Sequence, residues 1–242
     1  MNNVVDVCLT PDLIHLFSLK NKVVVVIDIF RATSVMCTAL NNGITEVVPV
    51  SDLNELNQFD TDEFLIAAER DGKIVKGFDF GNSPLTYFNK PEIEGKKLVL
   101  TTTNGTRAIN LCKNDTEDII IASFLNLKAV VNFLTKKQKD IVILCSGWKG
   151  QISLEDTLFA GCIIEELIRV GFSSESDSSF LSRQLFNDSK TNLIKFALQS
   201  SHKKRTENLG IDKDLRFCLQ LDKFDNVPIY KNGTIVLFND GI

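Results

Sequence analysis

The sequence predicts one α/β domain over residues 1–242, with a largely parallel or mixed sheet covered by helices. Three observations lead to this fold class. Apolar strand patterns alternate with helical patterns through the first two-thirds of the chain. The apolar run at residues 23–29 is too continuous for a strand with one exposed face, so it indicates a strand buried on both faces. The length of 242 residues fits one large domain, and no clear linker or repeat divides it.

The predicted elements follow in order along the chain. After the strand at 23–29, apolar residues recur every three or four positions from Ala32 to Leu40, which predicts a helix. Further strands are expected at 46–50, 64–68, 97–102, 118–122 and 140–145, and helices at 52–59, 106–112, 126–136 and 154–170. Residues 69–96 are rich in Gly and Pro and predict a long ordered loop. The polar stretch 180–222 predicts further helices, and Asn232-Gly233 predicts a C-terminal β-hairpin.

Composition argues against several classes of protein. The net charge of −4 is unlike that of a general nucleic-acid binder, which is usually basic. No apolar run reaches the length of a membrane span, and the N-terminus lacks the pattern of a signal peptide. The 6 cysteines include no CxxC spacing and are expected to be small buried residues in a reducing compartment. We therefore expect a cytoplasmic protein, with His15 and His202 in structural or surface positions and the basic residues 203–205 on a solvated helix face.

Polar side chains collect where three predicted strands end. The clusters contain Asp28, Arg31, Thr33 and Ser34 in the first, Thr102, Thr103, Asn104, Gly105, Thr106 and Arg107 in the second, and Cys145, Ser146, Gly147 and Trp148 in the third. In open α/β sheets, ligands bind beyond the carboxyl ends of the strands, where such loops meet. Three clusters at one predicted edge therefore indicate a binding site there.

The second cluster has the features of an anion-binding turn. Gly105 permits a tight turn and a close approach of the backbone. Thr106 is a candidate cap for the following helix, whose first N–H groups and partial positive charge would face an anion. Arg107 and Arg31 add guanidinium groups that pair with phosphate or sulfonate oxygens. The alternative is that Asn104-Gly105 forms an ordinary loop turn.

Cleavage of a phosphate ester calls for a divalent cation or a positioned nucleophile as well as a cradle of donors. Carboxylates at strand and helix ends are the candidates: Asp28, Glu69, Asp71, Glu155 and Asp156. Asp28 follows a strand buried on both faces, where an unpaired carboxylate is costly, so a metal or an arginine partner is expected. Glu155 and Asp156 have an alternative role, because acidic residues in the first turn of a helix stabilise it by interacting with the positive end of its dipole. Oxygen ligands without histidine fit Mg²⁺.

Four motifs in order closely resemble the 2-phosphosulfolactate phosphatase family, also called ComB: VVVVIDIFRATS, AAERDGKIVKGFDFGNSPL, LTTTNGTRAI and CSGWKGQISLEDTLFAG. The segment LGIDKDLRFCLQLDKFDNVPIY is also similar to that family, so the resemblance covers nearly the whole chain. It implies a Mg²⁺-dependent acid phosphatase that converts 2-phospho-3-sulfolactate to sulfolactate and phosphate, a step toward coenzyme M. It also implies a three-layer α/β/α fold and a homodimer.

The resemblance also implies roles for individual residues. Asp28, Glu69 and Asp156 become the candidate Mg²⁺ ligands and, with Arg31, the candidate catalytic residues. The implied substrate contacts are Arg31, Thr33, Arg70, Asn82, Ser83, Asn104, Thr106 and Arg107, to which the strand-end clusters add Ser34, Thr103, Gly105, Ser146 and Gly147. Arg70 or Arg107 would hold the sulfonate. Asp28 has three alternative roles, as metal ligand, as nucleophile on phosphorus or as activator of water.

Two other functions compete with this interpretation. Haloacid-dehalogenase-type phosphatases also place an Asp after an apolar strand, but they carry a second Asp two residues later, where this chain has Phe30. A non-catalytic binder of small phosphates or sulfonates would need the anion-binding turn and the arginines, but no carboxylates to hold a metal ion. Metal-dependent turnover would distinguish an enzyme from such a binder. A purely structural role would not explain why polar clusters follow three of the predicted strands. The residues by themselves predict a small, multiply anionic phosphate ester as ligand, and the sulfonate comes from the resemblance alone.

Overall fold

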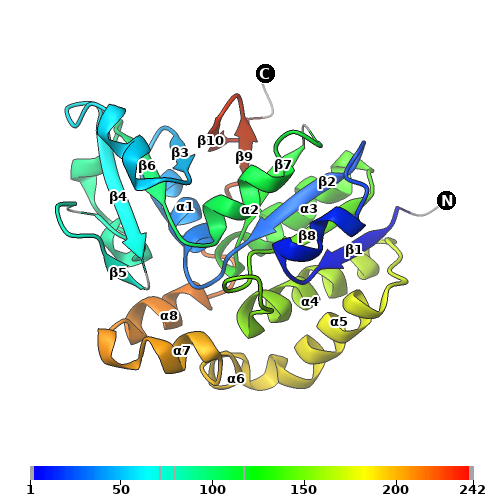
Figure 1. The fold of residues 1–242 in the computed structure, drawn as a ribbon. Coiled ribbons are helices and arrows are strands. Elements are labelled where there is room, and N and C mark those ends of the chain that lie inside the picture. The colour runs from blue at the N-terminus through cyan, green and yellow to red at the C-terminus, as the bar shows by residue number, and fades with distance from the viewer. Residues whose placement is uncertain (1–2, 71, 79, 117, 240–242) are drawn as a thin grey trace.

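The fold is a mixed sheet between layers of helices (Figure 1). In the computed structural model, which describes residues 3–70, 72–78, 80–116 and 118–239, ten strands form one sheet in the order β1-β8-β2-β7-β9-β10-β3-β6-β4-β5. The strands are Val5–Cys8 (β1), Val23–Ile27 (β2), Val47–Val50 (β3), Phe64–Arg70 (β4), Lys73–Ile74 (β5), Lys97–Thr101 (β6), Ile119–Ala122 (β7), Ile141–Cys145 (β8), Pro228–Lys231 (β9) and Thr234–Leu237 (β10). The predicted C-terminal hairpin is confirmed, because β9 and β10 pair antiparallel.

The helices of the described residues cover both faces of the sheet. The α-helices are Ala32–Asn41 (α1), Gly105–Cys112 (α2), Leu127–Lys137 (α3), Leu154–Arg169 (α4), Asp177–Ser189 (α5), Leu193–Ala197 (α6), Ser201–Arg205 (α7) and Asp212–Cys218 (α8). Short 3-10 helices span Pro11–Leu16 (η1), Leu53–Gln58 (η2), Pro84–Thr86 (η3), Pro91–Ile93 (η4), Phe124–Asn126 (η5), Lys190–Asn192 (η6) and Glu207–Leu209 (η7).

Alternate residues of β2 face two different helical layers. Val25 and Ile27 belong to a core cluster that includes residues of α3 and α4. Val24 and Val26 belong to a second cluster, which includes residues of α1 and α2. All four side chains are fully buried. Since successive residues of a strand point to opposite faces, β2 is buried on both, and the predicted α/β/α class is confirmed.

The sheet consists of two parallel blocks that run in opposite directions. Strands β1, β8, β2 and β7 are parallel to one another, and so are β3, β6 and β4. The β9–β10 hairpin lies between the blocks and pairs antiparallel with β7 on one side and β3 on the other. Five steps separate β2 from β6 in the sheet order, and a twist of about 20–25° at each step rotates their axes by roughly 100–125°. The arrowheads of β2 and β4 therefore both point toward the lower centre of Figure 1.

Two predicted segments differ from the structure. The helix expected at 52–59 is the 3-10 helix η2, which begins with a capping box formed by Asp52 and Glu55. The loop expected at 69–96 contains the end of β4, the short strand β5, and η3 and η4. β4 is longer than predicted because the chain turns back and pairs Glu69 with Ile74. This pairing holds Glu69 at the end of a strand.

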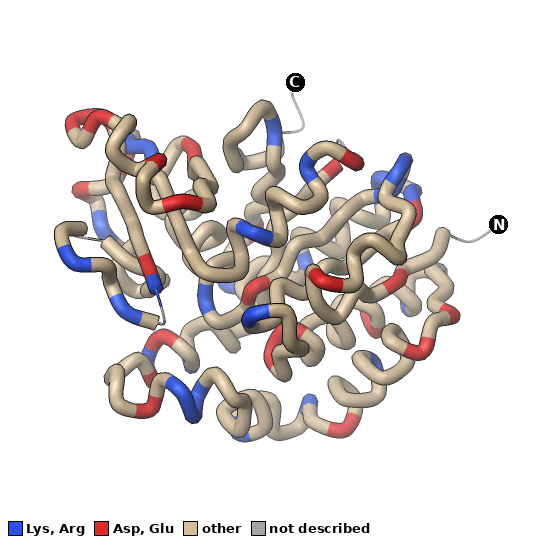
Figure 2. Tube along the Cα trace, viewed as in Figure 1, with Lys and Arg blue, Asp and Glu red and all other residues tan. Residues whose placement is uncertain are grey.

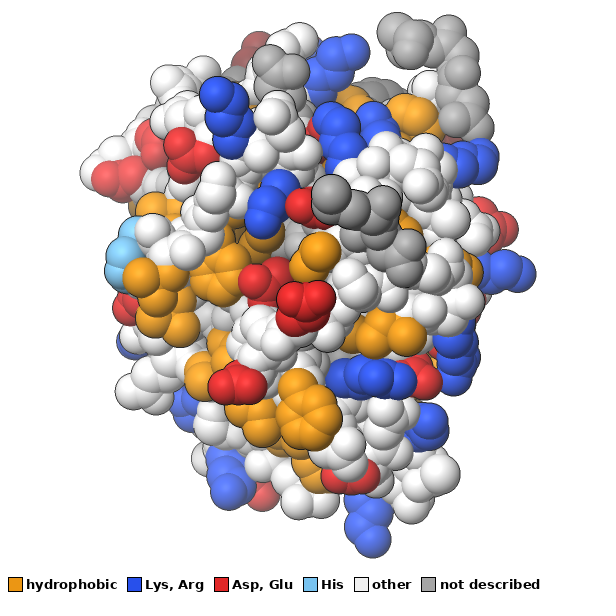
Figure 3. Space-filling model, turned by 90° about the vertical axis from the view of Figure 1, so that its right-hand side faces the viewer, with side chains coloured by type: hydrophobic (Ala, Val, Ile, Leu, Met, Phe, Trp, Pro, Cys, Tyr) orange, Lys and Arg blue, Asp and Glu red, His pale blue; other side chains and the backbone are white. Residues whose placement is uncertain are grey.

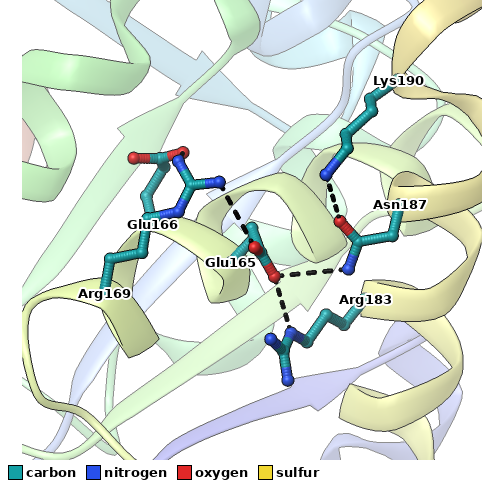
Figure 4. Close-up of polar contacts among 6 residues, drawn as sticks. All are labelled: Glu165, Glu166, Arg169, Arg183, Asn187 and Lys190. Carbon is teal, nitrogen blue, oxygen red and sulfur yellow. Dashed lines mark hydrogen bonds and ion pairs between the residues drawn. The ribbon is translucent and has the colours of Figure 1, made fainter.

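Helix α5 is tied closely to α4 and leads the chain toward the strand ends. A Cβ added at Gly161 of α4 would lie 1.9 Å from the Ser182 carbonyl oxygen of α5, so only glycine permits this approach. Glu165 accepts hydrogen bonds from Arg183 Nε at 2.7 Å and Asn187 Nδ2 at 3.3 Å (Figure 4). Beyond α5, the segments α6, α7 and α8 run below the sheet in Figure 1. They are thereby placed beneath the ends of β2 and β4.

The surface carries charges of both signs and scattered apolar groups. Acidic and basic positions are interspersed along the trace (Figure 2). On the face drawn in Figure 3, apolar side chains lie in small groups among charged ones. Within the described part of the chain, no helix combines the length and apolar character needed to cross a membrane.

Candidate active site

A cavity of about 140 Å³ is lined by residues that follow β2 and β8, end β4 and precede α2, together with residues of α7. Its lining consists of Asp28, Phe30, Arg31, Glu69, Gly72, Asn82, Asn104, Trp148, His202, Arg205 and Thr206. The predicted residues among them are Asp28, Arg31, Glu69, Asn82 and Asn104. The twisted sheet thus brings together side chains from both parallel blocks.

The turn between β2 and α1 holds Asp28 in place. Thr33 Oγ1 accepts a hydrogen bond from Asp28 N and is also within donating distance of Asp28 O, both at 3.0 Å. Ser34 Oγ donates to Ile29 O at 3.0 Å. The Phe30–Arg31 peptide bond of this turn is cis. Thr33 and Ser34, predicted as substrate contacts, are fully buried and engage the main chain of the turn.

Four buried carboxyl groups gather around this turn: Asp28, Glu69, Glu155 and Asp156. Burial raises the pKa of Asp28 well above its usual range, and the charges of Asp156, Glu69 and Glu155 raise it further. Burial and the nearby Asp156 raise the pKa of Glu155 to about 8. None of the ion pairs between described residues involves any of these four groups. The cluster therefore favours the binding of protons or of a cation.

Asp156 connects two strand ends. Its Oδ1 accepts from Ile29 N at 2.9 Å and its Oδ2 accepts from Gly147 N at 3.0 Å. Burial raises the pKa of Asp156 to about 6, while these N–H donors act in the opposite direction. Gly147 has φ of +59°, and a Cβ there would lie 2.3 Å from Gln151 O. Asp156, a predicted metal ligand, thus uses both oxygens to join the loops that follow β2 and β8.

Arg31 is buried and held from the side of α8. Its Nη1 forms an ion pair with Asp214 Oδ2 at 2.5 Å, and its Nη2 donates to Gly72 O at 3.2 Å. Ser83, a predicted substrate contact, donates to Asp214 Oδ1 at 2.7 Å. The buried Nε–H of Arg31 has no partner among the described residues. Because Arg31 also lines the cavity, it keeps a donor for an anionic ligand.

Helix α2 begins in direct contact with Asp28. A Cβ at Gly105 would lie 2.9 Å from Asp28 Oδ2 and 2.6 Å from Ala32 Cβ. The predicted cap at Thr106 is wrong, because the helix starts one residue earlier and Asn104 is its N-cap residue. The Thr106 hydroxyl instead donates to the carbonyl oxygen of residue 102 at 2.9 Å. The close approach at Gly105 brings the positive end of α2 to the Asp28 carboxylate.

Arg70 and Arg107, the two candidates for binding the sulfonate, point to partners outside the cavity. Arg70 Nη1 donates to Glu69 O at 2.7 Å, and its Nη2 donates to Thr101 Oγ1 at 3.1 Å. Arg107 pairs with Asp12 at 2.5 Å, and both side chains are about half exposed. Neither arginine is among the described residues that line the cavity.

Three other predicted substrate contacts keep buried polar atoms without a partner in the described part of the chain. They are Asn82 Oδ1, Thr103 Oγ1 and Ser146 Oγ. Asn82 lines the cavity itself. The candidate Asp71 lies outside the described residues.

The wall formed by α7 was not predicted, whereas the loop after β8 belongs to the third predicted cluster. His202, Arg205 and Thr206 line the cavity from α7 and its end, and Trp148 lines it from the loop. Arg205 is exposed, in line with the solvated helix face predicted for 203–205, but its guanidinium carbon also lies 4.2 Å from the centre of the Trp148 ring. The sequence offered one signal, because the single tryptophan of the chain follows a strand end.

His202 is a neutral side chain inside the site. Its ring lies 5.3 Å from that of Phe30, centre to centre. Burial lowers the pKa of His202 to about 3, and the charges of Arg31 and Arg205 lower it further. Its buried Nδ1 has no hydrogen-bond partner among the described residues. At neutral pH it therefore adds no positive charge to the cavity.

The carboxylates of the cavity fit Mg²⁺ as a two-ligand site. Within the described ranges, no group of three or more His, Cys, Asp and Glu side chains is arranged to hold a metal ion. Mg²⁺ keeps several waters, however, and is usually bound through one or two carboxylates and the substrate. Asp28 and Glu69 line the same cavity, while Asp156 has both oxygens on main-chain N–H groups. The donor set therefore matches the mode in which Mg²⁺ binds.

The fold and the site together define a class of protein. A small cavity beyond strand ends, with uncompensated carboxylates and a buried guanidinium that keeps a free N–H, is typical of an α/β enzyme acting on a small anionic molecule.

Comparison with known proteins identifies the family. The model of the 2-phosphosulpholactate phosphatase family matches residues 8–233. A protein of Caldanaerobacter subterraneus subsp. tengcongensis, named probable 2-phosphosulfolactate phosphatase, is 43% identical over 221 residues, which cover 90% of this chain and 91% of the relative. A protein of the same name from Clostridium perfringens strain 13 is 38% identical over 245 residues and covers 98% of both chains. The chain therefore belongs to the 2-phosphosulfolactate phosphatase family and is a phosphoric monoester hydrolase, as the motifs indicated.

Replacing Gly105 by alanine is expected to reduce both stability and activity. The new methyl group would meet Ala32, which cannot move without shifting α1, and the Asp28 carboxylate, which would have to turn out of its position. We expect a loss of about 1–3 kcal/mol in the free energy of unfolding and a fall in phosphate release of about 10²-fold. Urea denaturation and a phosphate-release assay measure the two effects.

A second substitution distinguishes the effect of the contact with Ala32 from that of the contact with Asp28. Adding Ala32→Gly to Gly105→Ala removes the nearer neighbour, so stability should recover relative to Ala32→Gly alone. Activity should stay low, because the contact with Asp28 remains. Full activity of Gly105→Ala would show that α2 need not approach Asp28 so closely.

Proposed function

We propose that this protein is a Mg²⁺-dependent phosphatase that hydrolyses 2-phospho-3-sulfolactate to 3-sulfolactate and phosphate. Family membership supports the phosphatase reaction, and the names of the relatives support the substrate. The observation that carries the metal-dependent part is the presence of Asp28, Glu69 and Arg31 in one cavity without a salt bridge to either carboxylate among the described residues. On the same resemblance, we place the reaction among the steps toward coenzyme M, in a cytoplasmic homodimer.

The side chains have separate roles in the proposed reaction. Asp28 and Glu69 would hold Mg²⁺, which supplies positive charge to a phosphoryl oxygen when it is bound. Arg31, kept in one orientation by Asp214 and Gly72 O, binds the phosphoryl group through its free N–H. Negative charge spreads over the phosphoryl oxygens as the ester bond breaks, so donors fixed in advance favour that state.

Asp28 has three alternative roles, as nucleophile, as metal ligand or as activator of water. One experiment distinguishes the nucleophile from the other two. If Asp28 attacks phosphorus, a phosphoenzyme forms on its carboxylate and can be trapped by rapid acid quench with labelled substrate. If Asp28 binds the metal or activates water, phosphate is released without such an intermediate.

The proposed function is tested by phosphate release from 2-phospho-3-sulfolactate, with Mg²⁺ and with EDTA, beside 2-phospholactate and an aryl phosphate. Release that needs Mg²⁺ and favours the sulfonated ester is the expected result. Equal release from all three esters would support the phosphatase activity but contradict the proposed preference for 2-phospho-3-sulfolactate. Binding of the sulfonated ester without any release would instead support the non-catalytic binder.

A further inference from the structure

The cavity has two guanidinium groups, and they are placed differently. Arg31 and Arg205 are the arginines among the described lining residues. Arg70 and Arg107, predicted from the sequence to hold the sulfonate, are engaged by other partners outside the cavity. A second anionic group of a substrate must therefore be met by Arg31 or Arg205 if an arginine meets it at all.

Arg31 lines the cavity together with Asp28 and Glu69 and is held rigidly. It follows Asp28 by three residues, and its side chain is only 4% exposed. Its ion pair with Asp214 and its hydrogen bond to Gly72 O fix the plane of the guanidinium. On the proposed function, Asp28 and Glu69 would hold the metal ion that binds the phosphoryl group, so Arg31 is the arginine assigned to that group.

Arg205 lines the cavity from α7 and is held by stacking. It is an exposed residue, with its guanidinium carbon 4.2 Å from the centre of the Trp148 ring. Its Nη1 donates to Ser201 Oγ at 2.7 Å, one turn earlier in α7. It forms no ion pair within 4.0 Å with a described acidic residue, although the charge of Glu155 acts on it from farther away. A stacked guanidinium keeps its edges free, so the remaining N–H groups can pair with an oxyanion.

We propose that Arg205, stacked on Trp148, binds the sulfonate of the substrate and selects sulfonated phosphate esters over esters without that group. The inference rests on the proposed function, which it deepens by assigning the specificity to one residue. A sulfonate carries a permanent charge on three equivalent oxygens and matches the planar fork of donors on arginine. The ester 2-phospholactate lacks this group but shares the phosphoryl and carboxylate groups, so it is the comparison substrate.

The test compares kcat/KM for 2-phospho-3-sulfolactate and 2-phospholactate in wild type, Arg205→Met and Arg205→Lys. Removing a hydrogen-bonded charge pair is expected to lower the ratio of the two values by about 10–100-fold in Arg205→Met, mainly through KM of the sulfonated ester. Arg205→Lys should retain part of the ratio, because the charge remains and the fork is lost. Lys204→Ala is the matched control: Lys204 is exposed on the same helix, does not line the cavity, and should leave the ratio unchanged.

Two results would overturn the inference. An equal fall in kcat/KM for both esters would assign Arg205 to the shared carboxylate or phosphoryl group. An unchanged ratio in Arg205→Met would show that another residue reads the sulfonate. If wild type hydrolyses neither ester, the proposed function fails, and calorimetric binding of 3-sulfolactate against lactate then decides the inference: wild type should prefer 3-sulfolactate, and Arg205→Met should lose that preference.

Discussion

Asp28→Asn is expected to lower phosphate release by about 10³-fold or more, with no loss of folding stability. The carboxylate is the group that would hold Mg²⁺ or act on phosphorus, and an amide does neither well. In the folded protein, burial and three neighbouring carboxylates raise the pKa of Asp28. The ionised side chain therefore destabilises the fold, and its neutral isostere should unfold at an equal or higher temperature.

The raised pKa of Asp28 also predicts how the stability of the protein changes with pH. Because the pKa of Asp28 is raised in the folded state, the folded protein holds a proton that the unfolded chain releases near its ordinary value of 3.8. The free energy of unfolding should thus decrease as pH rises above that value, and Asp28→Asn should decrease less steeply. Thermal unfolding in EDTA at several pH values measures this difference. A midpoint well below that of wild type at neutral pH would contradict the prediction.

Glu165→Gln serves as the matched control for this comparison. Hydrogen bonding to Arg183 lowers the pKa of Glu165, so its ionised form stabilises the fold. The same acid-to-amide change should therefore reduce stability and leave phosphate release unchanged, the reverse of the result at Asp28. Glu165 lies between α4 and α5, away from the lining of the cavity (Figure 4).

Asp214→Ala is expected to have the largest effect on stability. It leaves the guanidinium of Arg31 buried without its counter-charge, since the two side chains are only 4% and 8% exposed. Removing one partner of such a buried pair costs about 3–5 kcal/mol. Activity should fall as well, because Asp214 and Gly72 O set the orientation of Arg31 toward the substrate. Guanidinium denaturation and phosphate release measure these losses.

Asp214→Asn and Asp212→Asn separate positioning from folding. The amide of Asp214→Asn keeps an acceptor for Arg31, so more stability should remain than in the alanine variant, while KM for the phosphate ester should still rise. Asp212 lies on the same helix in an exposed pair with Lys203, and its loss should change stability by less than about 0.5 kcal/mol. A wild-type denaturation midpoint for Asp214→Ala would show that Arg31 does not depend on this partner.

Local sequence patterns predicted most of the elements because local forces determine them, although the strand β1 was not predicted. The continuous apolar run of β2 required burial on two faces, and the structure provides both layers. Asp28 follows β2 directly and Asn104 comes three residues after the end of β6, so their place near the strand ends followed from chain order. The position of Glu69 at a strand end also made it a candidate, and the family motif added Asn82; both line the cavity.

The remaining features depend on contacts between distant segments. Thr33 could be placed in the turn, but the sequence does not specify whether its hydroxyl meets a ligand or the main chain of Asp28. Arg107 follows a glycine turn suited to anions, yet Asp12, far away in the chain, pairs with it. The roles of Arg205 and Asp214 depend on the path of α6–α8 beneath the sheet, which no local pattern encodes.

The position of the β9–β10 hairpin bears on how a nascent chain acquires its activity. The hairpin follows all the other strands in the chain, yet it lies between the two parallel blocks of the sheet. During synthesis, β1, β8, β2 and β7 can assemble, and so can β3, β6 and β4, but nothing joins the two assemblies edge to edge until residues 228–237 have emerged. Asp28 comes from the first assembly and Glu69 from the second. The strand pairing that connects Asp28 to Glu69 through the sheet is therefore complete only when the last two strands of the chain are in place.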